Sequence, residues 1–228
     1  PDGKGNLSVA LPANVATDPA GNGNEAFSAV IDVNFDATPP TVTASTPPSS
    51  VNGPFDIIFT FTEDMSGLTA SDFNVENGTV TLTGGPREFT ATITPDGKGN
   101  LSVALPANVA TDLAGNGNEA FNAVIDVHFD VNAPTLVLST AISDVTGPFV
   151  ITATFSEAVR DFTAEDISVE NGALSDFSGS DTVFTATVTP VTIGEIVMSV
   201  ADAAAFDLAG NPSIGDTLSA TAGGGDAV

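Results

Sequence analysis

Apolar and polar residues alternate over short stretches through most of the chain, which is the pattern of half-buried β-strands. In residues 55–62 every second side chain is Phe or Ile, while Asp56 and Thr60 lie on the opposite face. Gly, Asn, Asp and Pro separate these stretches, and no segment has a sustained helical period. The chain is therefore predicted to be all-β.

Residues 37–130 hold enough of these stretches for a complete β-sandwich. Asn77-Gly78 is a two-residue turn signal, so a hairpin is expected between the third and fourth strands. Short strands separated by turn signals in this number are typical of an immunoglobulin-like sandwich, whose core the Phe-rich faces would fill. The expected strands are residues 41–45, 55–62, 72–76, 79–83, 88–94, 100–105 and 120–129.

The chain is also repetitive. Residues 1–36 recur almost unchanged as residues 95–130, and a more divergent match joins residues 51–78 with residues 145–172. The motif DPAGN, which starts at residue 18, recurs as DLAGN starting at residues 112 and 207. The chain thus contains half a repeat followed by two complete ones. The only differences in the first match are Pro19 for Leu113, Ser28 for Asn122 and Asn34 for His128.

Proline-containing linkers mark the boundaries between repeats, because proline removes a backbone donor and keeps the preceding residue extended. Such linkers occur at residues 36–40 and 130–134. We therefore expect tandem immunoglobulin-like domains in a linear array. The expected segments are the C-terminal half of a repeat in 1–36, a complete repeat in 37–130, a complete but more divergent repeat in 131–222, and a tail or linker in 223–228.

Charge and composition narrow the possible partners. The chain of 228 residues has 29 Asp or Glu against four Lys or Arg, a formal net charge of -25. No basic stripe is available to neutralise phosphates, so nucleic acid and anionic membrane surfaces are not expected as partners. No apolar stretch is long enough to insert into a bilayer.

The residue types needed for common catalytic sites are missing. The chain has no Cys and a single His, His128, so thiol catalysis, disulfides and a Cys- or His-ligated zinc site are excluded. No GxSxG or phosphate-binding loop occurs. Carboxylate pairs for glycoside hydrolysis would also need a cleft around them. The sequence predicts a protein that is not an enzyme.

Acidic residues that recur at matching places suggest a calcium site in each repeat. Glu63 and Glu157 continue the inward-facing parity of their strands, and an inward carboxylate needs a partner. Carboxylate and amide oxygens gathered without cations are the ligands that Ca²⁺ prefers. The expected ligands are Glu63, Asp72, Asp112 and Asn116, then Glu157, Asp166, Asp207 and Asn211, and Asp18 and Asn22 in the half repeat.

Turn chemistry offers an alternative interpretation of these residues. Asp and Asn form Asx turns in loops, and a Glu at the end of a strand can simply be solvated. Asp36 and Asp130 are candidates for a second calcium position, at the junctions between repeats, where an ion would stiffen the linker. At these two residues the simpler interpretation, an Asp before a proline turn, is favoured.

The order of the short sequence motifs shared by the two complete repeats resembles that of a known protein family. GPF, F(T/S)E and VENG are followed by FTAT.TP and then D.AGN. This order resembles the bacterial Ig-like repeats of large secreted and surface adhesins, of the RTX and biofilm-associated types. The resemblance implies an extracellular array at the cell surface, in which the repeats are spacers that extend a terminal binding domain. It does not identify the ligand of that domain.

The expected partners are neighbouring repeats of the same chain or adjacent copies in a fibre. One alternative function is a self-assembling filament or surface-layer subunit, in which strand donation from another chain completes residues 1–36. Another is an accessory carbohydrate-binding module of a surface enzyme. That module would need an exposed aromatic platform, and the chain has no Trp and no Tyr.

Overall fold

The protein is described by a computed structural model that covers residues 5–7, 9–27, 33–97 and 99–223. Within these ranges the strands form one two-stranded sheet and four four-stranded sheets. The only helices among the described residues are two short 3-10 turns, and no helix there is long and apolar enough to cross a membrane. The all-β prediction is confirmed.

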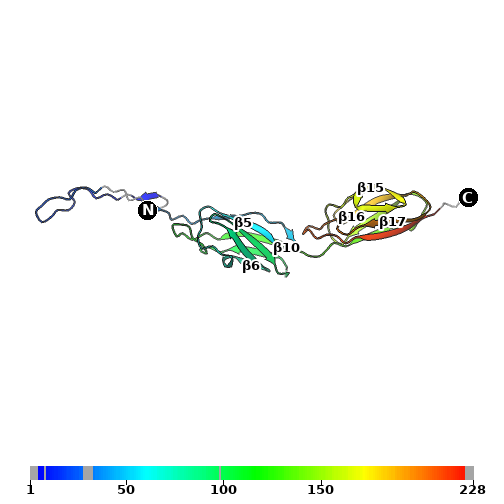
Figure 1. The fold of residues 1–228 in the computed structure, drawn as a ribbon, viewed down its shortest axis with the longest axis horizontal. Coiled ribbons are helices and arrows are strands. Elements are labelled where there is room, and N and C mark those ends of the chain that lie inside the picture. Colours follow the sequence, from blue (N-terminus) through cyan, green and yellow to red (C-terminus); the bar gives the residue numbers. More distant parts are fainter. Residues whose placement is uncertain (1–4, 8, 28–32, 98, 224–228) are drawn as a thin grey trace. The chain divides into compact units, whose positions relative to one another are not determined.

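Residues 37–130 form two four-stranded sheets (Figure 1). One sheet has the order β3-β5-β8-β7 and is antiparallel throughout. The other has the order β4-β10-β9-β6, in which β4 pairs parallel to β10. The elements are β3 (Val42–Ala44), β4 (Ser50–Val51), β5 (Phe55–Phe61), η1 (Ala70–Asp72), β6 (Asn74–Glu76), β7 (Gly78–Gly84), β8 (Glu88–Pro95), β9 (Leu101–Leu105) and β10 (Phe121–Phe129).

Strand β5 shows why this part of the sequence packs as a sandwich. Its residues alternate strictly between buried and exposed, as the apolar alternation predicts. The ring of Phe59 lies 5.0 Å from the ring of Phe73, and its edge-on contact with Phe121 has a centroid distance of 5.5 Å. Phe121 begins β10 in the opposite sheet, so Phe59 joins the two layers.

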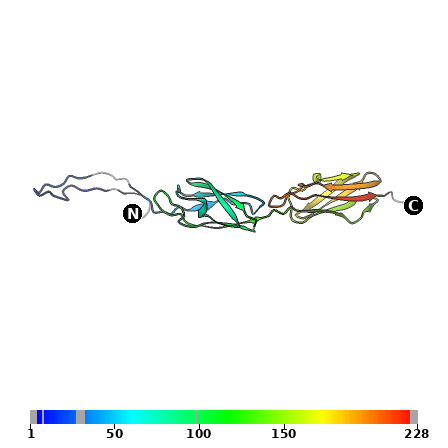
Figure 2. The same cartoon turned by 60° about the horizontal axis from the view of Figure 1, so that its bottom comes forward.

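The last repeat has the same topology. Its sheets have the orders β11-β13-β16-β15 and β12-β18-β17-β14, and Figure 2 shows these strands as two layers. Its buried residues form one apolar core. The elements are β11 (Leu136–Thr140), β12 (Asp144–Val145), β13 (Phe149–Phe155), η2 (Ala164–Asp166), β14 (Ile167–Glu170), β15 (Gly172–Ser180), β16 (Val183–Pro190), β17 (Gly194–Val200) and β18 (Asp216–Ala222).

In the half repeat, the described residues contain two short strands, β1 (Gly5–Leu7) and β2 (Val33–Phe35), which pair antiparallel. Parts of the predicted segments 1–36 and 223–228 lie outside the described residues. By packing, the chain divides into two compact units. They are Pro1–Pro47 with Phe55–Asp96 and Ser102–Ile125, and Pro48–Pro54 with Gly97–Leu101 and Asp126–Val228.

The predicted hairpin at Asn77-Gly78 is wrong. Asn77 does adopt the left-handed conformation of a tight turn, with φ 59°. However, β6 and β7 belong to different sheets, so the turn carries the chain from one layer to the other. A turn signal reveals a change of direction but not the partner of the strand that follows. Strand β4 was also missed, because two residues are too few to show an alternation.

Candidate metal centre

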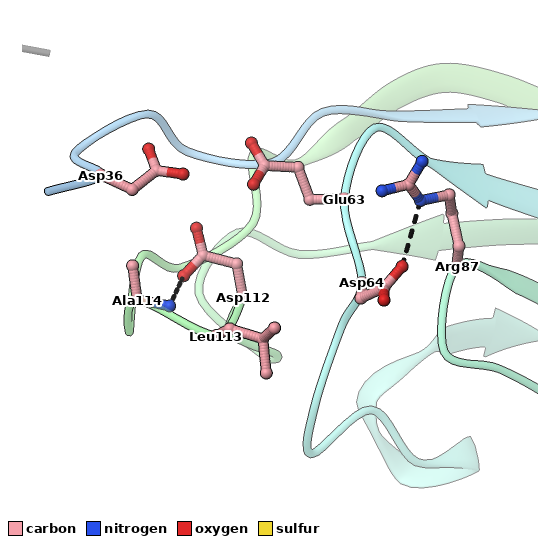
Figure 3. Close-up of a pocket in the computed structure, with 7 residues that line it drawn as sticks. All are labelled: Asp36, Glu63, Asp64, Arg87, Asp112, Leu113 and Ala114. Carbon is pink, nitrogen blue, oxygen red and sulfur yellow. Dashed lines mark hydrogen bonds and ion pairs between the residues drawn. The ribbon is translucent and has the colours of Figure 1, made fainter. Parts of the chain in front are cut away.

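Three carboxylates of the middle repeat converge at one point. One oxygen from each of Asp36, Glu63 and Asp112 lies within 4.8 Å of the other two. Figure 3 shows the three side chains facing one another, with Leu113 and Ala114 lining the same pocket. Asp112 is buried, and Asp36 and Glu63 are half-buried. We call these three residues the first acidic cluster.

Each member of the cluster comes from a different part of the repeat. Asp36 directly follows β2, and Glu63 lies two residues beyond the end of β5. Asp112 begins the DLAGN loop between β9 and β10. All three residues lie in loops. The distances between their carboxylates are therefore set by the positions of the neighbouring strands.

The DLAGN loop holds the carboxylate of Asp112 in place through its own backbone. Oδ1 of Asp112 accepts hydrogen bonds from the backbone N–H groups of Ala114 and Asn116, both at 2.8 Å. Nδ2 of Asn116 donates to the other oxygen, also at 2.8 Å. Gly115 has φ 92°, which explains a glycine at this point of the loop. The loop therefore aims one carboxylate at a fixed position.

The same loop also holds the chain that enters the repeat. Nδ2 of Asn116 donates a hydrogen bond of 3.1 Å to the main-chain oxygen of Asp36. Oδ1 of Asp36 accepts from the backbone N–H of Thr38 at 3.0 Å, as in an Asx turn. The turn interpretation of Asp36 therefore describes its local geometry. The bond to Thr38 uses one of the two carboxylate oxygens of Asp36.

An equivalent second acidic cluster occurs in the last repeat. One oxygen from each of Asp130, Glu157 and Asp207 again lies within 4.8 Å of the others. Asp207 accepts from the backbone N–H groups of Gly210 and Asn211 at 2.7 and 2.8 Å. Nδ2 of Asn211 donates to Oδ2 of Asp207 at 2.7 Å and to the main-chain oxygen of Asp130 at 2.9 Å. The arrangement is thus built twice.

The two clusters affect the protonation of their members in different ways. Burial raises the pKa of Glu157 above its ordinary value, and the negative charges of Asp130 and Asp207 raise it further. For Asp112, burial alone would raise the pKa, but the hydrogen bonds from Asn116 and its neighbours outweigh it and lower the pKa. Glu157 therefore experiences repulsion that a bound cation would relieve.

The two nearby arginines are engaged with other groups. Nε of Arg87 pairs with Asp64 at 3.2 Å, at the side of the first pocket (Figure 3). Nε of Arg160 donates to the main-chain oxygen of Asp207 at 3.2 Å, and its guanidinium also pairs with Asp161. The arginines thus bond to an adjacent carboxylate or to the backbone beside the clusters.

Oxygen groups in this arrangement suit a calcium ion. Ligand oxygens lie about 2.3–2.6 Å from Ca²⁺, so two oxygens on one ion are separated by at most about 5 Å. The 4.8 Å limit within each cluster satisfies this condition without further movement. Three carboxylates supply part of the usual six to eight ligands, and water and carbonyl oxygens commonly supply the remainder. The residues present therefore fit Ca²⁺.

The structure places the sequence-predicted residues in a different grouping. Glu63 with Asp112, and Glu157 with Asp207, are brought together as expected from the repeats. The junction residues Asp36 and Asp130 join these pairs instead of forming a second position. Asn116 and Asn211 lie in the same loops, where their amide nitrogens donate to the Asp side chains. The predicted ligands Asp72 and Asp166 lie elsewhere and do not join the clusters.

Asp72 and Asp166 cap the two 3-10 turns. Oδ2 of Asp72 accepts from the backbone N–H and from the hydroxyl of Thr69, both at 2.7 Å. Asp166 makes the same two bonds with Thr163, at 2.7 and 2.9 Å. This is the capping-box arrangement of a Thr followed three residues later by an acidic residue. The sequences TASD (69–72) and TAED (163–166) contain this capping-box pattern.

Asp18 and Asn22 form the same loop in the half repeat. Oδ1 of Asp18 accepts from the backbone N–H groups of Ala20 and Asn22, both at 2.9 Å, and Nδ2 of Asn22 donates to Oδ2 at 3.0 Å. The hydrogen bond from the side chain of Asn22, followed by those from the backbone, lowers the pKa of Asp18. Among the described residues, no other acidic side chains join Asp18 in a cluster.

The sequence model of the bacterial Ig-like domain family matches residues 36–128 and again residues 130–222. Asp130 thus begins the second matched domain, whereas Glu157 and Asp207 lie within it. None of the curated proteins searched matches the sequence.

Solved structures that match the chain include two bacterial proteins and a bovine one. Invasin, described as a bacterial integrin-binding protein, is 13% identical with a TM-score of 0.40, over 86% of this chain and 44% of its own. The adhesin InvE of Yersinia pseudotuberculosis is 14% identical with a TM-score of 0.28, over 80% of this chain and 58% of its own. Bovine butyrophilin is 8% identical with a TM-score of 0.29, over 81% of this chain and 99% of its own.

Proposed function

The chain belongs to the bacterial Ig-like domain family, and from this premise we propose that it is a non-catalytic, extracellular spacer of a large surface adhesin, stiffened by calcium. The observation that carries the proposal is the acidic cluster built twice at equivalent places, each with one ligand from the start of a matched domain. In this role the domains hold a terminal binding region away from the cell surface.

The stiffening follows from where Asp130 lies. It follows β10 of the middle repeat and begins the second matched domain, so it belongs to the segment that joins the two repeats. An ion bound by Asp130 together with Glu157 and Asp207 would fasten this segment to the last repeat. A linker held in this way loses backbone freedom, which reduces bending between neighbouring domains.

The repeats themselves support a spacer role. Residues 95–130 and 1–36 differ at only three positions, so nearly the same sequence module is reused along the chain. Modules that contact only their neighbours lengthen an array without any new interface. The high negative charge, -25 in total, keeps such an array soluble and prevents its copies from collapsing on one another.

The proposed function needs no catalytic group, and it places the protein outside the cell. The convergent side chains of both clusters are carboxylates whose neighbouring groups are loop backbone and Asn amides. Millimolar calcium is available to extracellular modules, whose affinities commonly fall near 10⁻⁴–10⁻³ M. Weak sites of this kind would be filled outside the cell and empty in the cytosol.

The experiment that tests the proposed function measures bending between the two matched domains. Small-angle X-ray scattering of the full chain should give a larger radius of gyration in calcium than in chelator, at a salt concentration of about 0.15 M that screens surface charge. Magnesium at the same ionic strength serves as the control for screening. A chain with both Asp36→Asn and Asp130→Asn should scatter alike in both conditions. Identical wild-type profiles with and without calcium would rule out stiffening.

A further inference from the structure

The chain contains five Asn-Gly pairs, a pair in which the Asn side chain can lose its amide spontaneously. Glycine carries no side chain, so its backbone nitrogen can approach the side-chain carbonyl carbon of the preceding Asn. In an unfolded chain the five pairs would react at similar rates, so the fold decides which of them reacts first. The pairs are Asn22-Gly23, Asn52-Gly53, Asn77-Gly78, Asn116-Gly117 and Asn171-Gly172.

Asn52 and Gly53 lie in the turn between β4 and β5, where both reacting groups are accessible. The side chain of Asn52 is exposed. No described residue accepts a hydrogen bond from the N–H of Gly53 or bonds to the side chain of Asn52. A Cβ added to Gly53 would meet nothing within 4 Å, so the glycine nitrogen has room to move toward the side chain.

At two other pairs, hydrogen bonds hold the amide nitrogen that would leave. Nδ2 of Asn116 donates to Asp112 at 2.8 Å and to the main-chain oxygen of Asp36 at 3.1 Å. Nδ2 of Asn22 donates to Asp18 at 3.0 Å. A Cβ on the glycine that follows either Asn would collide with another Asn side chain. Ring closure at these pairs would therefore break bonds and displace close neighbours.

The pair Asn171-Gly172 is held by four side-chain hydrogen bonds. Nδ2 of Asn171 donates to the main-chain oxygens of Thr192 and Glu195 at 3.1 and 3.0 Å. Its Oδ1 accepts from the backbone N–H and the hydroxyl of Thr192 at 3.0 and 2.6 Å. A Cβ on Gly172 would lie 2.8 and 3.0 Å from two valine side chains. Asn77 occupies the same place in the middle repeat and has the same φ of 59°.

We propose that Asn52-Gly53 is a site of spontaneous covalent modification in the folded chain. The backbone nitrogen of Gly53 forms a bond to Cγ of Asn52 and gives up its proton, and the side-chain amide leaves as ammonia, which closes a succinimide ring. Water then adds to one of the two ring carbonyls and opens the ring. The product carries a carboxylate at residue 52, as aspartate or as isoaspartate, and water is the only co-reactant.

The new carboxylate lies beside Arg160. Asn52, Arg160 and Gly210 belong to the same compact unit. A Cβ on Gly210 would lie 3.6 Å from Nδ2 of Asn52 and 3.9 Å from Nη2 of Arg160, so both nitrogens approach the same point of the DLAGN loop. Both are donors and cannot bond to each other. A carboxylate oxygen in place of the amide nitrogen is an acceptor of opposite charge, so deamidation replaces two facing donors with an ion pair.

Mass spectrometry of the aged protein tests the proposal. The full chain is incubated in mildly alkaline buffer and digested with pepsin, and each Asn-Gly pair is scored for amide loss. We expect Asn52 to react at least about tenfold faster than the other four Asn residues, which must first open locally. In concentrated urea the five rates should converge. Gly53→Ala, whose Cβ has free space, should keep the fold and slow the reaction at Asn52 by at least about tenfold.

Thr146→Asn should create a second reactive site in the last repeat. Thr146-Gly147 aligns with Asn52-Gly53 and has the same exposure and the same open space at its glycine. The new amide should be lost about as fast as that of Asn52. The proposal is overturned if Asn52 stays intact, if all five pairs react alike in the folded chain, if Gly53→Ala reacts as fast as the wild type, or if the new amide is stable.

The ion pair is tested separately in a chain with Asn52→Asp. By NMR titration, the pKa of the carboxylate at residue 52 should be lower in this chain than in one that also carries Arg160→Gln, because the guanidinium favours the charged form. Equal pKa values in the two chains would overturn the pairing with Arg160.

Discussion

The side-chain amide of Asn211 donates a hydrogen bond of 2.9 Å to the main-chain oxygen of Asp130, 81 residues earlier in the chain. Asp130 also contributes its carboxylate to the cluster with Glu157 and Asp207. The residue that joins the two repeats is therefore held through its backbone by an Asn and through its side chain by an acidic cluster. Asn116 and Asp36 repeat this relationship at 3.1 Å.

Replacing Asn211 with Ala should destabilise the last repeat even without calcium. The change removes donors to Oδ2 of Asp207 and to the main-chain oxygen of Asp130, and it leaves a buried carboxylate with fewer partners. We expect a loss of about 1–3 kcal/mol, measured by urea unfolding in chelator. Asn22→Ala is the matched control, because Asn22 bonds Asp18 in an exposed loop outside both complete repeats. Equal unfolding midpoints for both variants would refute this role of Asn211.

Replacing Glu157 with Gln should change the stability of the last repeat in opposite directions with and without calcium. In chelator the last repeat should become more stable, because a carboxylate that Asp130 and Asp207 repel is neutralised. In calcium at about a hundredfold above its Kd, the wild type should gain about 2.7 kcal/mol at this site, and the variant should gain almost none. Differential scanning calorimetry in the two buffers measures both effects. Glu165→Gln, at an exposed position of the same repeat, should behave like the wild type.

The contributions of Glu157 and Asp112 to the pH dependence of stability should differ in sign. Because the folded pKa of Glu157 is raised, its contribution in chelator is present below its unfolded pKa and is lost as pH rises through the folded pKa. The folded pKa of Asp112 is lowered, so its contribution is present above its unfolded pKa and is lost as pH falls through the folded pKa. Comparing the wild type with Glu157→Gln at each pH isolates the first effect. A pH-independent difference between the two chains would be inconsistent with the raised pKa.

Phe59 should be essential to the stability of the middle repeat and should not affect that of the last repeat. Its ring is fully buried and contacts Phe73 and Phe121, so Phe59→Ala leaves a large cavity that costs about 3–5 kcal/mol. The neighbouring Ile58 faces outward and is 41% exposed, so Ile58→Ala on the same strand should cost under about 1 kcal/mol. Calorimetry of the full chain should show one transition lowered by Phe59→Ala and the other unchanged. Loss of both transitions would mean that the repeats do not fold independently.

The fold could be predicted from the sequence because its two main signals are local and repeated. Alternation in residues 55–61 gives the strand and its buried face, and the recurrence of residues 51–78 at 145–172 gives the second sandwich. Which strands become neighbours is not a local property. Asn77 therefore predicted a turn correctly, but the partner of the following strand incorrectly.

The candidate site could be predicted only in part, for the same reason. Parity selected Glu63, and the repeated DxAGN word selected Asp112, so two members of the first cluster were grouped from sequence. The sequence predicts a separate position for Asp36, because sequence spacing does not show that the entry to the repeat meets the loop before its last strand. Recurrence suggests Asp72 as a ligand, although the Thr three residues before it indicates a helix cap.

Isothermal titration of the full chain with calcium tests the central claim most directly. The account predicts that Glu63→Gln and Glu157→Gln each remove one of two equivalent binding events, and that the double variant removes both. Glu76→Gln and Glu170→Gln, which alter a recurring but exposed Glu, should leave both events intact. Absence of calcium binding by the wild type, or binding that survives in the double variant, would contradict the account.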